Sequence, residues 1–108
     1  MSTMRLNTIE REAVQTACRE AMPPGTRVLL FGSRLDDGRL GGDIDLLVEL
    51  PQQLCAAEVV DRRTRFAARL YRLLDEQRID VLMAGPQDRA DRAVLVEARR
   101  QGVELARA

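Results

Sequence analysis

Breaks at proline and glycine constrain this fold more than any other feature of the sequence, because they cut the chain into short segments. Segments whose apolar residues recur at helical spacing alternate with short apolar runs that are typical of buried strands. The pattern predicts three helices and three strands. In chain order they are a helix from Thr8 to about Met22, strands at Arg27–Phe31 and Asp43–Leu50, a helix from about Leu54 to Gln77, a strand at Ile79–Met83 and a helix from about Asp88 to Gln101.

This order of elements predicts an α+β or mixed α/β fold, built as a small mixed sheet with helices packed on one side. The 108 residues suffice for one compact domain and leave no room for a second, so we expect a single domain over residues 1–108. Apolar residues make up 45% of the chain, whereas aromatic residues make up only 3%, so the core is expected to consist mainly of Leu, Val, Ile and Ala. The longest predicted helix carries an apolar stripe formed by Val59, Phe66, Leu70, Leu73 and Leu74.

The composition excludes several kinds of site. The chain contains no His and no Lys, which rules out a His-ligated zinc site, a Ser-His-Asp triad and a Schiff-base lysine. Its net charge of zero argues against direct binding of nucleic acid through a basic face. Cys18 and Cys55 form no spaced metal motif and are interpreted as two buried thiols. Because the sequence shows no secretory segment and no run of membrane-spanning length, we expect a cytoplasmic protein that does not bind membranes.

The motif Asp43-Ile44-Asp45 is the strongest local signal for a functional site. Side chains alternate between the two faces of a strand, so both carboxylates project from one face, about 7 Å apart at Cα, and Ile44 and Leu46 point toward the helices. Two like charges held together repel each other, and Mg²⁺ would compensate them because it binds carboxylate and phosphate oxygens. A solvated pair of acids at the start of a strand would give the same pattern.

A third carboxylate lies within the last predicted strand. Asp80 interrupts the apolar run Ile79–Met83, where aspartate is disfavoured. A neighbouring strand could bring it beside Asp43 and Asp45 and complete a cluster of three acids. An edge-strand aspartate that faces water, or one paired with Arg78, would also explain its position.

A candidate phosphate-binding turn follows the first predicted strand directly. In Gly32-Ser33, glycine lets the backbone approach a phosphate closely, and the serine hydroxyl and nearby N–H groups can donate to its oxygens. Arg34 could add positive charge to the same site. Since Gly-Ser is also an ordinary turn, the prediction depends on the conjunction of this turn, the Asp-x-Asp strand and the later strand acid, in that order.

The combined pattern LLFGSR…GGDIDLLVEL…RIDVLM resembles the DNA polymerase β-like nucleotidyltransferase superfamily, and most closely its minimal (MNT) branch. That superfamily carries an apolar strand ending in Gly-Ser, then Asp-x-Asp among apolar residues, then an acid on a later strand. The resemblance covers roughly residues 28–83. The intervening LDDGRLGG departs from the family's more usual basic stretch followed by Ser-Asp, which bears on the triphosphate contacts of this loop but not on the metal ligands.

The resemblance implies a transferase that uses two Mg²⁺ ions and a nucleoside triphosphate, with ATP as the expected substrate. Asp43, Asp45 and Asp80 would be the catalytic and metal-binding residues, and Asp80 could also accept the proton of the acceptor hydroxyl. Gly32 and Ser33 would hold the β- and γ-phosphates, and Arg34 would lie beside them.

The resemblance also implies a partner protein. Similar minimal domains are commonly the antitoxin of a toxin–antitoxin pair whose toxin is a helical HEPN-domain ribonuclease, and some transfer AMP from ATP to a tyrosine of that partner. We therefore expect transfer of a nucleoside monophosphate to a hydroxyl on a partner protein, with the acceptor surface supplied by that protein or by a second copy of this chain. The alternatives are a catalytically inactive module of the same fold that masks a toxin, and an unrelated small α/β domain. The acceptor, the base preference, the number of units transferred and the oligomeric state stay open.

Overall fold

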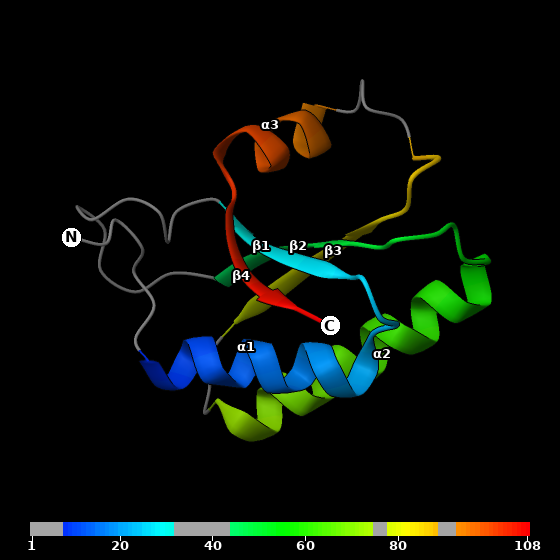
Figure 1. Cartoon of the computed structure of the whole chain (residues 1–108). Helices are drawn as coiled ribbons and strands as arrows, with labels where there is room; N and C mark the ends of the chain where they lie inside the picture. Colours follow the sequence, from blue (N-terminus) through cyan, green and yellow to red (C-terminus); the bar gives the residue numbers. More distant parts are fainter. Residues whose placement is uncertain (1–7, 32–43, 75–77, 89–92) are drawn as a thin grey trace.

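The computed structural model describes residues 8–31, 44–74, 78–88 and 93–108, and within them the chain forms three helices and four strands (Figure 1). The strands form one sheet in the order β3-β2-β1-β4. β1 pairs antiparallel with both β2 and β4, and β2 pairs parallel with β3. The predicted α+β fold with a small mixed sheet is thereby confirmed. The elements are α1 (Thr8–Ala21), β1 (Arg27–Phe31), β2 (Ile44–Glu49), α2 (Ala56–Leu73), β3 (Ile79–Ala84), α3 (Ala93–Gln101) and β4 (Val103–Arg107).

The main core lies between one face of the sheet and the helices α1 and α2. Alternate strand residues such as Leu30, Leu46 and Val48 point into this layer and are fully buried there. The predicted stripe on α2 is confirmed for Phe66, Leu70 and Leu74, which are buried; Val59 is half-buried, and Leu73 is 36% exposed and lies outside the core. The helix itself begins and ends inside the predicted range, which ran from about Leu54 to Gln77.

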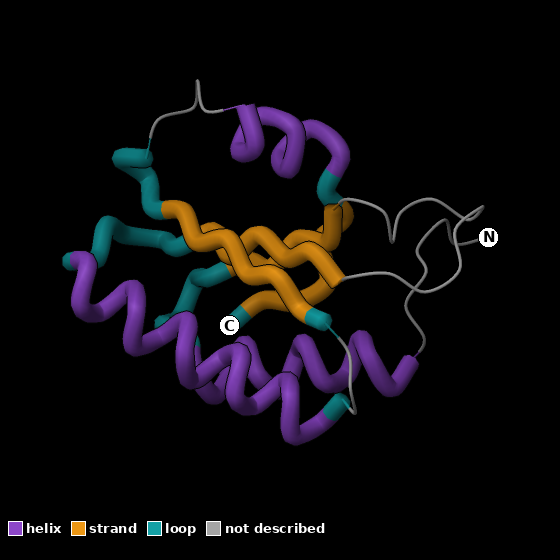
Figure 2. The backbone as a smooth tube through the Cα atoms, turned by 180° about the vertical axis from the view of Figure 1, so that it is seen from behind, coloured by secondary structure: helices purple, strands orange, loops and turns teal. Residues whose placement is uncertain are grey.

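The helix α3 lies on the opposite face of the sheet from α1 and α2 (Figures 1 and 2). There Leu95 and Ala98 pack against Leu29, Leu47 and Ala84 in a second apolar cluster. The expectation that the helices pack on one side therefore holds for α1 and α2 only. The physical reason is that the central strands β1 and β2 are apolar on both faces, and both faces need cover from water.

The strand β4 was not predicted from the sequence. It extends the sheet on the far side of β1, and a register irregularity between Val28 and Leu29 interrupts the pairing. Gly102 joins it to α3, where its N–H donates to the carbonyl of Ala98 over 2.8 Å. Charged residues at Glu104 and Arg107 interrupt the apolar pattern of this strand, so its sequence alone does not indicate a buried element.

The two cysteines differ in their surroundings. Cys18 is fully buried on α1, as predicted. Cys55 is exposed at the N-cap of α2, so the prediction that both thiols are buried is wrong for this residue. It follows an exposed stretch that begins at Pro51 and precedes the first turn of the helix, where no other element covers it.

Candidate functional site

Two of the predicted site residues, Asp45 and Asp80, lie in the part of the chain that the structure describes. They occupy neighbouring strands, β2 and β3. The predictions for Asp43 and for Gly32, Ser33 and Arg34 concern positions outside the described residues, so they stay predictions.

The parallel pairing of β2 with β3 makes Asp45 and Asp80 direct register partners. Because neighbouring strands lie about 4.8 Å apart, the two residues are adjacent in space. Backbone hydrogen bonds fix this register at both ends of the pair: Ile44 N–H donates to the carbonyl of Arg78 over 2.8 Å, and Leu50 N–H donates to the carbonyl of Ala84 over 2.8 Å. The adjacency of the two carboxyl groups is thus set by the sheet itself.

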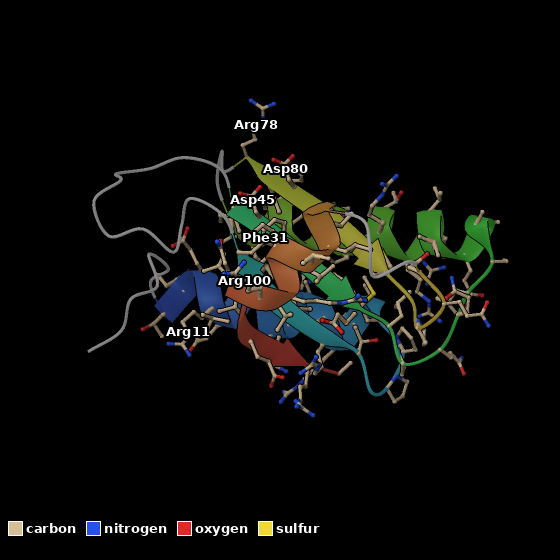
Figure 3. All side chains as sticks on the ribbon, turned by 90° about the horizontal axis from the view of Figure 1, so that it is seen from above. Arg11, Phe31, Asp45, Arg78, Asp80 and Arg100 are labelled. Atoms are coloured by element: carbon tan, nitrogen blue, oxygen red, sulfur yellow. The ribbon has the colours of Figure 1, made fainter. Side chains whose placement is uncertain are left out.

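Both carboxylates belong to the α3 face of the sheet. Ile44 and Leu46, on either side of Asp45, belong to the core under α1 and α2, as do Ile79 and Val81 on either side of Asp80. Strand alternation therefore directs the two aspartates to the other face. Figure 3 shows Asp45 and Asp80 close together at one end of the molecule, with Phe31 beside Asp45.

The electrostatics of this pair favour a bound cation. Asp45 is half-buried and Asp80 is exposed, and among the described residues the Asp80 side chain makes no hydrogen bond or ion pair. Two like charges about 4 Å apart repel by about 1 kcal/mol in water, and by more where the protein lowers the effective dielectric constant. Mg²⁺ takes carboxylate oxygens, often from one or two side chains together with phosphate oxygens, so this pair of donors fits it.

The described residues supply two carboxylates at this place. Among them, no group of three or more His, Cys, Asp or Glu side chains gathers in a way that could hold a metal ion. The third predicted ligand, Asp43, lies two positions before Asp45 and outside the described residues. A complete three-carboxylate cluster therefore remains a prediction, and the observed pair is the part of it that the sheet positions.

Phe31 brings the end of β1 to this pair. It is the register partner of Asp45 on the antiparallel side, so Asp45 lies between Phe31 and Asp80 across three strands. Gly32 and Ser33 follow Phe31 in the sequence. Sequence reasoning did not single out Phe31, because only the strand register reveals which residue of β1 lies beside Asp45.

Two exposed arginines lie at the same end of the molecule as the carboxylates. Figure 3 shows Arg78 beyond Asp80, and Arg100, near the C-terminal end of α3, on the Phe31 side. The placement of Arg100 agrees with the chain that follows it, since Leu30 pairs with Val103. Sequence reasoning treated the last helix only as a packing element and therefore missed this arginine.

Asp80 also borders a depression between β3 and α2. The depression has a volume of about 430 Å³, and Arg63, Thr64 and Tyr71 of α2 contribute to its wall. The Tyr71 hydroxyl accepts a long hydrogen bond, 3.4 Å, from the N–H of Ile79. Asp80 thus lies on an edge strand and faces solvent, so its geometry also satisfies the simpler interpretation of an edge-strand aspartate.

The chain matches no model of a known protein family, and no curated protein matches it. None of the described helices combines the length and the apolar character that a membrane span requires.

Proposed function

We propose that this protein is a Mg²⁺-dependent nucleotidyltransferase that transfers a nucleoside monophosphate, AMP from ATP, to a hydroxyl group. The observation that carries the proposal is the register pairing of Asp45 with Asp80 on one face of a parallel strand pair. The sequence pattern supports it, because the Asp-x-Asp motif and the Gly-Ser turn stand in the expected order along the chain.

In this mechanism the protein positions the reactants through its carboxylates. Asp45 and Asp80, together with Asp43, would hold the metal ions, and the Gly32-Ser33 turn with Arg34 would bind the β- and γ-phosphates. When bound, Mg²⁺ supplies charge neutralisation to the triphosphate and to the departing pyrophosphate. The acceptor oxygen forms a bond to the α-phosphorus while the bond from that phosphorus to pyrophosphate breaks.

The proton of the acceptor hydroxyl needs a base. The chain has no His, so a carboxylate has to take this role. Asp80 is the more exposed member of the described pair, and its carboxylate projects from the face of the sheet opposite α2, where an acceptor can approach it. We therefore assign proton acceptance to Asp80.

The acceptor in this proposal is a hydroxyl on a partner protein, and the partner is a HEPN-type toxin that the modification neutralises in the cytoplasm. This part of the proposal rests on the resemblance of the sequence pattern to minimal nucleotidyltransferases.

An inactive module that masks its partner is the second candidate. The exposure of Asp80 on an edge strand favours it, because a carboxylate that merely faces water needs no catalytic explanation. The two candidates differ in what happens when the carboxylates are neutralised without a change of shape, since a mask depends on its surface and an enzyme on its charged groups.

Label transfer from ATP tests the proposal. The protein is incubated with Mg²⁺ and α-labelled ATP, alone and with the protein encoded beside it, using the wild type, Asp45→Asn and Asp80→Asn. Asp61→Asn is the matched control, because Asp61 is an exposed aspartate of α2 whose ion pair with Arg65 lies away from the site. Transfer that is lost in both site variants and kept in the control supports the enzyme. A stable complex without any transfer, unaffected by the site variants, supports the mask, and absence of both transfer and complex contradicts the proposed function.

A further inference from the structure

The outer edge of β3 and the neighbouring side of α2 form a groove, which we call the edge groove. Two separate depressions of about 430 and 360 Å³ lie along it. Arg63, Ala67, Tyr71 and Val81 line the first, and Val60 and Met83 line the second. Val60 is 52% exposed and Tyr71 is 48% exposed, so the groove shows large apolar side chains to solvent. Figure 2, seen from behind, has β3 nearest the viewer with α2 below it.

The backbone of β3 directs hydrogen-bonding groups toward this groove. The carbonyls of Arg78 and Ala84 accept bonds from β2, so the even-numbered residues of β3 direct their backbone groups toward β2. Ile79, Val81 and Met83 therefore direct theirs outward, and the bond from Ile79 N–H to the Tyr71 hydroxyl agrees with this direction. No strand in the described part of the chain pairs with this edge, and an open edge is a template for another strand.

We propose that a second copy of this chain covers the edge groove, with the two β3 strands pairing antiparallel across a two-fold axis at Val81. The result is one continuous sheet of eight strands, four from each copy. This inference does not rest on the proposed function, because it uses neither the carboxylate pair nor a nucleotide.

Hydrogen-bond direction and charge select this register among the possible ones. Outward residues can pair only with outward residues, so the axis at Val81 also pairs Ile79 with Met83 of the second copy and uses all three outward residues. Moving the two-fold axis by one residue toward the start of β3 would place Asp80 directly opposite Asp80 of the second copy. Like charges in that position are destabilising. With the axis at Val81, Asp80 lies opposite Leu82 instead. The long 3.4 Å bond from Ile79 to Tyr71 is exchanged for a bond between strands.

Side chains of α2 in one copy can contact complementary side chains of α2 in the other copy across the same axis. Arg63, Ala67 and Tyr71 recur every four residues, so they share one face of the helix, and all three line the first depression together with Val81. With small Ala67 near the axis, two antiparallel α2 helices can approach closely, and Arg63 of one copy meets Tyr71 of the other. Arg63 makes no ion pair with any residue that the structure describes. A guanidinium over an exposed aromatic ring gives a cation–π contact at each end.

The mass of the protein in solution tests the proposal, with a matched pair of variants on adjacent residues. Light scattering coupled to size exclusion, over a series of concentrations, is expected to give twice the chain mass of 12.1 kDa. Ala67→Arg places a bulky charged side chain at the axis and is expected to give the monomer. Ala68→Arg is the control, because Ala68 is exposed and lines a separate depression with Glu20 and Arg69; it is expected to leave the dimer intact.

Hydrogen exchange of the wild type provides a reading that needs no variant. The Val81 and Met83 amides are expected to exchange more slowly as the protein concentration rises, because they bond to the second copy only in the dimer. A wild type that stays monomeric at every concentration, whether or not another protein binds the groove, overturns the proposal. So does a dimer that survives Ala67→Arg, or exchange at these two amides that is independent of concentration.

Discussion

Asp45 on β2 and Asp80 on β3 are direct partners across a parallel strand pair, and both belong to the face that α3 covers. The backbone bonds at the two ends of the pair hold this register, so the carboxyl groups stay neighbours whether or not a ligand is present. This preformed pair is what a cation would bind.

Mg²⁺ is therefore expected to stabilise the folded protein. A ligand that binds only the folded state at 100 times its dissociation constant adds about 2.7 kcal/mol, which raises the melting temperature of a domain this size by several degrees. The Asp45→Asn/Asp80→Asn variant is expected to show no such rise, and without Mg²⁺ it should melt at or slightly above the wild type because the repulsion is gone. Differential scanning calorimetry with and without Mg²⁺ measures both effects. An equal rise in wild type and variant would exclude this pair as the metal site.

Asp80→Asn is also expected to lower the rate of label transfer about 10²-fold or more, because the amide cannot accept the acceptor's proton. Single-turnover rates of the wild type and the variant at one pH give the comparison. A rate that Asp80→Asn leaves unchanged would assign the proton to another group.

The buried thiol of Cys18 makes the stability of the protein fall at alkaline pH. Burial raises its pKa to about 11 from 9.0, although the charge of Arg19 opposes the shift. Because the folded-state pKa is the higher one, the contribution to stability is complete below pH 9 and is lost as the pH rises toward 11, by roughly 2–3 kcal/mol. Urea unfolding between these pH values is expected to show the loss in the wild type and a flatter profile in Cys18→Ala. In the native protein, iodoacetamide should modify the exposed Cys55 and spare Cys18.

Gly102→Ala is expected to destabilise the fold by about 1–3 kcal/mol, because a Cβ at this position would clash with the backbone carbonyl of Ala98. Gly85→Ala is the matched control. Its Cβ would meet the end of the Gln53 side chain, which can rotate away, so a smaller loss is expected. Urea midpoints of the two variants make the comparison. Equal losses of stability would show that a Cβ at Gly102 is tolerated as well as one at Gly85.

Leu95→Ala tests whether α3 is part of the core. Leu95 is fully buried against the second face of the sheet, so its truncation is expected to cost about 2–4 kcal/mol. Val96→Ala, on the same helix at 46% exposure, should change the free energy of unfolding only slightly. A negligible cost at Leu95 would mean that α3 does not pack on the sheet in solution.

Local patterns in the sequence predict most of the elements, because apolar period and helix breakers act over a few residues. The strand at Arg27–Phe31 agrees with its predicted bounds, and the burial of Ile44 and Leu46 confirms the predicted direction of Asp45. The strand β4 was missed because its stability comes from pairing with β1 and not from its own sequence, in which Glu104 and Arg107 interrupt the apolar pattern.

The candidate site could be predicted only in part, for a similar reason. The residue types and their order indicated Asp45 and Asp80, since aspartates are unusual inside apolar strands. Their adjacency, and the position of Phe31 beside them, depend on the order and register of strands distant in sequence. The sequence analysis placed the helices on one side of the sheet and did not predict the second layer, because no local signal assigned α3 to the other apolar face of β1 and β2.

The place of β4 at the edge beside β1 has a consequence for the order in which the protein acquires its structure during synthesis. β1 is synthesised early and β2 follows it directly in the chain. β4, the other neighbour of β1 in the sheet, emerges from the ribosome only after α2, β3 and α3. Residues at that end then close the sheet onto early elements: Ala108 exchanges backbone bonds with Gly25 and Thr26, and the Gln15 amide donates to the carbonyl of Arg107 over 2.9 Å. Until those residues are released, one side of β1 is open to chaperones and to other nascent chains.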